Sequence, residues 1–137
     1  MAKKNIITLF ITDDDVDDRE FLTAALLQNG FREIIKEFKN GEELMNHLTA
    51  NPASPADLII LDLNMPVKNG YQALKELKEN DDFRNIPVII LTSSSKLEDE
   101  QYCYNLGCSN FFRKPLSFTG YIRLAEDIIS FTKKIQN

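Results

Sequence analysis

Apolar runs and amphipathic stretches alternate along the whole chain. Short runs rich in branched and aromatic side chains predict strands, and apolar residues spaced three or four apart predict helices. The predicted strands cover residues 6–12, 33–38, 58–61, 87–91 and 111–112. The predicted helices cover residues 17–29, 42–48, 70–78, 96–106 and 117–135, with Ser117 as the N-cap of the last one.

Five strands that alternate with five helices indicate an α/β fold. Such a pattern predicts a parallel sheet with helices on both faces, joined by right-handed crossovers. The run Leu58-Ile59-Ile60-Leu61 is apolar at every position, which is typical of a strand covered on both faces. No linker or low-complexity segment divides the chain, so we expect residues 1–137 to form one domain without an output domain.

Composition and charge narrow the class of protein. The chain has 137 residues, of which 43% are hydrophobic and 27% charged, as in ordinary globular proteins. Its formal net charge of −5 argues against direct binding to nucleic acid, because an acidic surface repels phosphate backbones. No apolar run reaches the roughly 20 residues that a membrane span needs, and Met1-Ala2-Lys3-Lys4 does not begin a signal peptide.

The remaining reactive side chains support a cytoplasmic protein. Cys103 and Cys108 lie five residues apart, which is neither a metal-binding pair nor a disulfide framework, so we expect free thiols in a reducing compartment. The single histidine, His47, lies in the short second helix, where a surface or half-buried position is expected rather than a ligand role.

Polar residues follow four of the five predicted strands. Asp13 and Asp14 follow the first strand, Asp62 the third, Thr92 the fourth and Lys114 the fifth. In an open parallel sheet, ligands bind beyond the carboxyl ends of the strands. We therefore expect three carboxylates, a hydroxyl and an ammonium group to converge on one edge, although about 100 residues of sequence separate them.

The chemistry of this set points to a cation and a phosphoryl group. Clustered carboxylates repel each other unless a cation neutralises them. Oxygen ligands without histidine or cysteine suit Mg²⁺, which also borrows phosphate oxygens. A carboxylate beside such a metal can attack a phosphoryl group and form an acyl phosphate, and a lysine would offset charge on the phosphoryl oxygens.

Taken singly, each of these residues has an ordinary alternative explanation. A lone aspartate at a strand end often caps the next helix, and a lone lysine is usually a surface residue. Asp15 and Asp17 are expected to be solvated or to cap the first helix. Asp18 and Glu20 are expected to form a solvated face with Arg19. The joint pattern at four strand ends makes chance an improbable explanation.

The motifs resemble the receiver domain of bacterial two-component response regulators, in its CheY-like form. The resemblance covers essentially the whole chain, and each motif is weak alone. It rests on Thr12-Asp13-Asp14-Asp15, Leu61-Asp62-Leu63-Asn64-Met65-Pro66 with Gly70, Pro87-Val88-Ile89-Ile90-Leu91-Thr92-Ser93 and Lys114-Pro115. It implies a flavodoxin-like (βα)5 sheet with strand order 2-1-3-4-5.

The resemblance assigns roles at the strand ends. Asp62 would be the phosphoacceptor, and Asp13 and Asp14 would hold Mg²⁺ together with Asp62 and the backbone carbonyl of Asn64. Lys114 would pair with a phosphoryl oxygen.

The resemblance also implies a switch. Thr92 would be the switch hydroxyl, and Phe111 would be the switch aromatic, at a position where the family often has tyrosine; a purely structural core role is the alternative for Phe111. The outer face of helix 96–106, the fifth strand and the last helix would then change on phosphorylation. The resemblance implies two partners, a sensor histidine kinase and a downstream target or phosphotransfer protein. The chain itself would be a monomer or a phosphorylation-dependent homodimer.

Three further alternatives concern the subtype and the chemistry. The segment from Thr49 to Ala56 resembles stand-alone receivers paired with phytochromes or hybrid sensor kinases, or else is a plain surface loop. A haloacid-dehalogenase-type phosphohydrolase would need a second aspartate two residues after the nucleophile, where this chain has Asn64. A pseudo-receiver that is never phosphorylated conflicts with the intact residue set. We expect self-phosphorylation and self-dephosphorylation only, and no enzymatic turnover.

Overall fold

The computed structural model describes residues 6–136, and every predicted strand and helix is present. The strands are β1 (Thr8–Thr12), β2 (Ile34–Phe38), β3 (Leu58–Leu61), β4 (Val88–Thr92) and β5 (Asn110–Arg113). The helices are α1 (Val16–Gln28), α2 (Gly41–Ala50), α3 (Gly70–Glu79), α4 (Leu97–Leu106) and α5 (Phe118–Gln136). No predicted end differs from the observed one by more than about two residues, the usual uncertainty of element boundaries. The expectation that residues 1–4 do not begin a signal peptide concerns residues outside the described ones.

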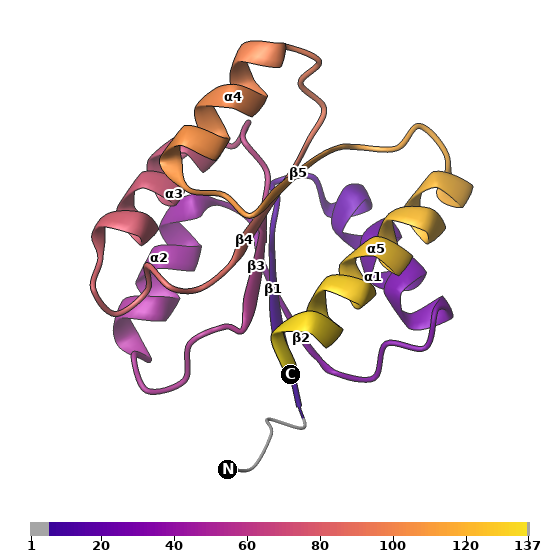
Figure 1. Ribbon diagram of the computed structural model, residues 1–137, viewed down its shortest axis with the longest axis horizontal. Coiled ribbons are helices and arrows are strands. Elements are labelled where there is room, and N and C mark those ends of the chain that lie inside the picture. Colours follow the sequence, from indigo (N-terminus) through magenta and orange to yellow (C-terminus); the bar gives the residue numbers. More distant parts are fainter. Residues whose placement is uncertain (1–5, 137) are drawn as a thin grey trace.

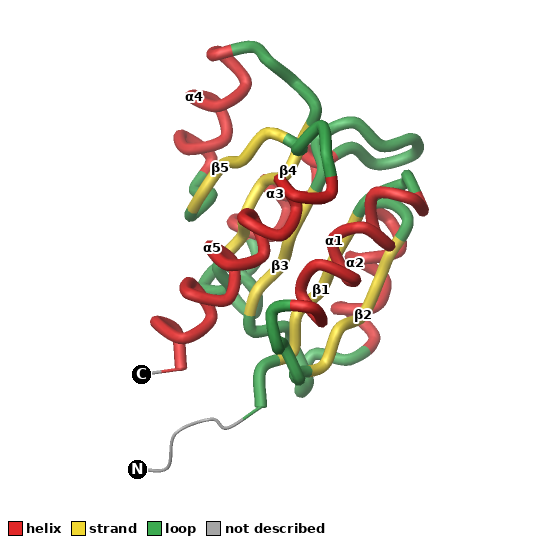
Figure 2. Tube along the Cα trace, turned by 90° about the vertical axis from the view of Figure 1, so that its right-hand side faces the viewer, coloured by secondary structure: helices red, strands yellow, loops and turns green. Residues whose placement is uncertain are grey.

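The five strands form one parallel sheet in the order β2-β1-β3-β4-β5. Figure 2 shows the strands side by side in this order. The flavodoxin-like order implied by the motifs is therefore confirmed. The order places β1 and β3 next to each other at the centre, so residues that follow these two strands are neighbours in space.

Helices cover both faces of the sheet, with α1 and α5 on one face and α2, α3 and α4 on the other (Figure 1). Side chains of β3 alternate between the two apolar cores: Ile59 and Leu61 pack on the α2–α4 side, and Leu58 and Ile60 pack on the α1–α5 side. All four are buried. This double burial explains why β3 is apolar at every position.

Local signals determine where the helices begin and end. Asp15, Asn40 and Asn69 accept backbone N–H groups of the first turns of α1, α2 and α3, which satisfies donors that the helix leaves without partners. The Ser117 hydroxyl accepts the N–H of a residue in the first turn of α5, as predicted. Gly107 ends α4 with a φ of 109°, a conformation that glycine adopts without strain.

The other chemistry-bearing side chains lie away from the strand ends or in the core. Cys103 and Cys108 are buried free thiols, as expected. His47 is half-buried, and its ring centroid lies 5.4 Å from that of Phe10 and 5.1 Å from that of Phe38, so its predicted structural role is confirmed. Among residues 6–136, no helix has the length and apolarity to cross a bilayer.

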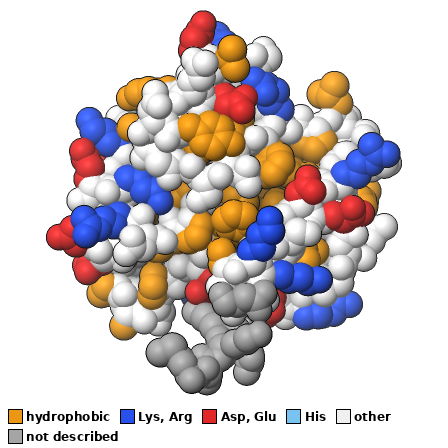
Figure 3. Space-filling model, in the orientation of Figure 1, with side chains coloured by type: hydrophobic (Ala, Val, Ile, Leu, Met, Phe, Trp, Pro, Cys, Tyr) orange, Lys and Arg blue, Asp and Glu red, His pale blue; other side chains and the backbone are white. Residues whose placement is uncertain are grey.

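The face over β5 and its flanking helices α4 and α5 turns toward the viewer in Figure 3. Hydrophobic side chains gather along the middle of this face, and charged side chains of both signs surround them. Exposed aromatic residues of α4, Tyr102 and Tyr104, belong to the same part of the fold. A mixed surface of this kind is typical of regions that contact other proteins.

Candidate functional site

Backbone hydrogen bonds hold three predicted site residues at the strand ends. Asp13, Asp62 and Lys114 each donate the backbone N–H to the last carbonyl of the adjacent strand, at 3.0, 3.0 and 2.8 Å. The sheet ladder therefore continues one residue past β1, β3 and β5. Side chains that start from such a rigid ladder have little freedom to move apart.

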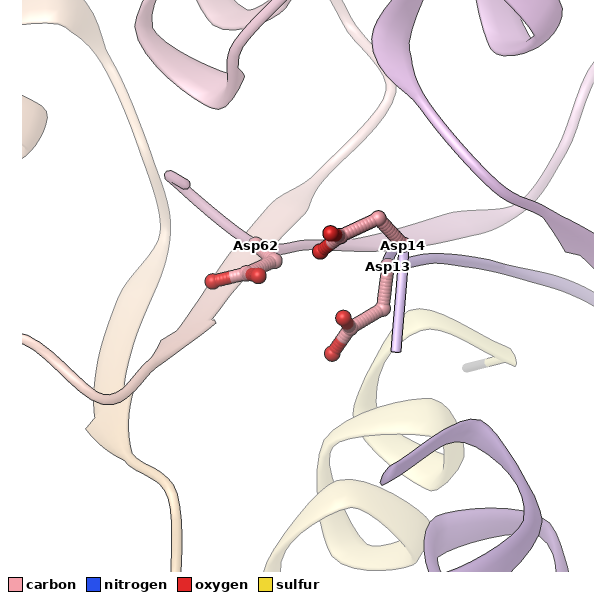
Figure 4. Close-up of side chains that lie close together, drawn as sticks. All are labelled: Asp13, Asp14 and Asp62. Carbon is pink, nitrogen blue, oxygen red and sulfur yellow. The ribbon is translucent and has the colours of Figure 1, made fainter. Parts of the chain in front are cut away.

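Three carboxylates gather beyond the central strands. Asp13, Asp14 and Asp62 each offer one oxygen, and these oxygens all lie within 4.8 Å of one another. Figure 4 shows the three side chains in one space, two from the end of β1 and one from the end of β3. Asp13 is 5% exposed and Asp62 4% exposed, whereas Asp14 is open to solvent. The cluster is therefore a buried pair with one exposed carboxylate beside it.

The Lys114 ammonium group contacts three carboxylates from the fifth strand end. Its Nζ lies 2.8 Å from Oδ2 of Asp13, 2.7 Å from Oδ2 of Asp18 and 3.4 Å from Oδ2 of Asp62. The lysine side chain is only 11% exposed. The structure thus brings together the predicted lysine and the predicted aspartates, and adds Asp18 to them.

Burial and the Lys114 ammonium shift the pKa values of the buried aspartates in opposite directions. Burial raises the pKa of Asp13 to about 6, although the Lys114 ammonium acts in the opposite direction. Burial also raises the pKa of Asp62, again against the effect of Lys114. Burial alone would lower the pKa of Lys114, but its carboxylate partners outweigh this and raise it. Burial outweighs the ammonium at both aspartates, and three carboxylates face this one ammonium group.

The donor set fits a hard divalent cation. The buried Oδ1 of Asp62 has no hydrogen-bond partner within residues 6–136, so it remains available as a ligand. The cluster consists of carboxylate oxygens alone, which Mg²⁺ and Mn²⁺ prefer. A bound cation would stabilise the ionised forms of Asp13 and Asp62, whose pKa values are raised by burial. Asn64 lies exposed two residues after Asp62, and its carbonyl role stays a prediction.

Thr92 and Phe111, the predicted switch pair, are both buried. The Thr92 hydroxyl accepts the backbone N–H of Ser94 at 3.4 Å. Phe111 is 8% exposed and packs in the core on the α2–α4 side, with the Arg113 guanidinium carbon 5.6 Å from the ring centroid. This position agrees with the core role of Phe111, and a movement of either side chain stays a prediction.

A hydrogen-bond link connects the loop after β4 to two helices. The hydroxyl of Ser94 donates to one carboxylate oxygen of Asp99 in α4, and the hydroxyl of Tyr71 in α3 donates to the other. These two hydrogen bonds lower the pKa of Asp99. Sequence reasoning missed this link, because residues on separate elements show no spacing that relates them.

The loop after β3 folds back closely on Asp62. A Cβ atom on Gly70 would lie 2.1 Å from the carbonyl oxygen of Asp62, closer than any real contact. The Gly70 N–H donates to the carbonyl of Leu63 at 2.9 Å and holds this arrangement. Glycine at this position therefore allows α3 to start directly behind the phosphoacceptor candidate.

The expectation that Asp18 and Arg19 lie on a solvated face is wrong. Asp18 has a side chain only 24% exposed and pairs with Lys114. Arg19 donates to the carbonyl of Asp13 at 2.5 Å and to Glu37 at 3.0 Å, which ties α1 to the ends of β1 and β2. The helical period could have predicted the partly buried position of Asp18. Asp18 lies four residues before the buried Leu22 and therefore on the same helix face.

Comparison with known proteins agrees with this geometry. Residues 9–125 match the family model for the response regulator receiver domain. The two-component response regulator ARR6 of Arabidopsis thaliana is 36% identical over 85 residues, which are 58% of this chain and 46% of that protein. The chain spans only 24% to 53% of the length of three curated relatives that it matches.

Two solved structures cover nearly the whole chain. The phosphorylated cyanobacterial phytochrome response regulator RcpA has a TM-score of 0.85 at 28% identity, covering 92% of this chain and 93% of that one. The Mn²⁺-bound form of the response regulator Rcp1 has a TM-score of 0.83 at 26% identity, covering 91% and 93%. The chain therefore belongs to the family of response regulator receiver domains, the signalling switches of two-component systems.

Proposed function

We propose that this chain is a two-component phosphorelay switch that accepts a phosphoryl group on Asp62 from the phosphohistidine of a sensor kinase, with Mg²⁺ held by Asp13, Asp14 and Asp62. The observation that carries the proposal is the state of the Asp62 carboxylate. It is buried, one oxygen has no hydrogen-bond partner among the described residues, and the other lies 3.4 Å from Lys114. A carboxylate in this state could act both as a nucleophile and as a metal ligand.

The transfer exchanges one bond to phosphorus for another. An oxygen of Asp62 attacks the phosphorus atom, the new O–P bond gives an acyl phosphate, and the N–P bond of the donor breaks with its electron pair left on the imidazole nitrogen. Lys114 would offset the charge of a phosphoryl oxygen, since its Nζ lies 3.4 Å from Asp62. When bound, Mg²⁺ supplies positive charge that stabilises the phosphoryl oxygens.

The same residues support a switch without enzymatic turnover. The acyl phosphate is lost when water attacks phosphorus, so the chain would catalyse only its own phosphorylation and dephosphorylation. Asn64 occupies the position two residues after Asp62, and its amide is not a general acid or base at neutral pH. This residue disfavours a phosphohydrolase of the haloacid-dehalogenase type.

The signal would leave through the face over α4, β5 and α5 (Figure 3). The Thr92 hydroxyl would move toward the new phosphoryl oxygens, and Phe111, two strands' width from Asp62, would adjust in the space beside it. The changed face would bind a downstream protein, a phosphotransfer protein or a second copy of the chain. We propose a cytoplasmic location, where sensor kinases expose their phosphohistidine.

The test is phosphorylation of the purified protein by acetyl phosphate with and without Mg²⁺, followed by intact-mass spectrometry. We expect the mass of one phosphoryl group to appear with Mg²⁺ and to be absent in EDTA. The three-carboxylate cluster is the reason for the metal requirement. Absence of the added mass with Mg²⁺, or equal labelling in EDTA, would contradict the proposed function.

A further inference from the structure

Asp18 is held in place from two sides. It lies in the first turn of α1, and its Oδ2 accepts the Lys114 ammonium at 2.7 Å. Its Oδ1 accepts the hydroxyl of Tyr121 in α5 at 3.5 Å. Burial and the neighbouring carboxylate raise the pKa of Tyr121 to about 12, so the tyrosine keeps its proton at neutral pH. The Asp18 carboxylate is therefore held beside the site by hydrogen bonds from two elements, Lys114 after β5 and Tyr121 in α5.

The position of Lys114 reflects this charge. Its Nζ lies 2.7 Å from Asp18 and 2.8 Å from Asp13, but 3.4 Å from Asp62. Charge-assisted hydrogen bonds are strongest at about 2.7–2.9 Å. The lysine thus lies closer to Asp18 in α1 and to Asp13 after β1 than to the phosphoacceptor candidate Asp62.

A cation bound by the three-carboxylate cluster would strengthen the preference of Lys114 for Asp18. Asp13, Asp14 and Asp62 form the group that can share a cation, and Asp18 is not part of it. With those three carboxylates neutralised by the cation, Asp18 keeps a negative charge that Lys114 alone contacts among the cationic side chains of residues 6–136. A phosphoryl oxygen on Asp62 then has to compete with Asp18 for the ammonium group.

We propose that Asp18 is a positioning residue that holds Lys114 on the α1 side and thereby lowers the affinity of the site for a phosphoryl group. The inference rests on the proposed function, since it concerns the same site. The negative charge of Asp18 would then determine in part how readily the phosphorylated state forms. Asp18 does not itself contact the phosphoryl group in this account.

The experiment compares Asp18→Asn with Asp17→Asn. Both variants remove one negative charge from the first turn of α1, but Asp17 is exposed and is not among the Lys114 partners. Beryllofluoride with Mg²⁺ serves as a stable mimic of the phosphoryl group, and calorimetry measures its affinity. We expect Asp18→Asn to bind it about fivefold to tenfold more tightly than wild type, as expected for release of a partly buried ion pair. The control should change by less than about twofold.

Mg²⁺ affinity, measured without beryllofluoride, separates the positioning role from a ligand role. It should fall no more in Asp18→Asn than in Asp17→Asn, because Asp18 lies outside the carboxylate cluster. Equal or weaker beryllofluoride binding in Asp18→Asn than in the control overturns the inference, as does a selective loss of Mg²⁺ affinity. If wild type is labelled by acetyl phosphate, these outcomes leave the proposed function intact. Failure of wild type to bind beryllofluoride counts against both.

Discussion

Asp62→Asn is expected to abolish phosphoryl labelling of the protein by acetyl phosphate in Mg²⁺. An amide is not a nucleophile of useful strength, so the loss should exceed about 100-fold, as for removal of other catalytic nucleophiles. Asparagine keeps the shape of the side chain, and the backbone N–H of residue 62 still pairs with the end of β1 at 3.0 Å. The loss would therefore report on chemistry and not on folding.

Asp81→Asn is the matched control for this variant. It removes the same charge from a side chain that is 88% exposed and lies in the turn after α3, in a surface ion pair with Arg84. Surface ion pairs contribute little to stability, so this control should label at the rate of wild type. Labelling of Asp62→Asn at a rate near that of the control would mean that another residue accepts the phosphoryl group.

Asp13→Asn is expected to weaken Mg²⁺ binding by at least about 100-fold. Changes in residues that only orient metal ligands already cost 10–100-fold, and Asp13 is itself a proposed ligand. Isothermal titration calorimetry measures the affinity directly. A variant that keeps wild-type affinity would exclude Asp13 from the metal site.

The same variant should stabilise the protein when no metal is bound. The pKa of Asp13 is raised from 3.8 to about 6, so the folded state binds this proton more tightly than the unfolded state. Its contribution to stability is fully present below pH 3.8 and is lost as the pH rises through about 6. At pH 7.5 the ionised Asp13 is therefore a cost, which asparagine removes.

Urea unfolding in EDTA at pH 7.5 tests this sign. We expect the free energy of unfolding of Asp13→Asn to exceed that of wild type by about 1–2 kcal/mol, allowing for partial solvent screening of the charge. Saturating Mg²⁺ should stabilise wild type much more than the variant, since ligand binding to the folded state adds to its stability. A variant less stable than wild type in EDTA would contradict a net cost of burying the ionised Asp13 carboxylate.

The hydrophobic pattern predicts the fold well because each element has its own periodic signal. The apolar run of β3 and the three- and four-residue spacing of α5 are local features, and the helix caps at Asp15 and Ser117 follow from neighbouring residues. The convergence of Asp13, Asp62 and Lys114 also follows from the sequence, because parallel strands end at one edge of the sheet.

What the sequence does not predict is which side chain meets which at that edge. The charged neighbours of Asp18 predict a solvated face, although Asp18 pairs with Lys114 at the site. The Ser94–Asp99–Tyr71 link joins three elements through side-chain rotamers that no sequence spacing encodes. Such contacts depend on how α1, α3 and α4 pack against the sheet, which is determined by the tertiary structure and not by local sequence.

Locating the phosphoryl group on the wild-type chain would show whether Asp62 receives it. Borohydride reduces an acyl phosphate to an alcohol, which converts a phosphorylated aspartate into homoserine that peptide mass spectrometry can identify. After labelling with acetyl phosphate in Mg²⁺, we expect homoserine at position 62 and at no other aspartate. Homoserine at position 13 or 14, or a phosphoryl group stable to borohydride on another residue, would contradict it.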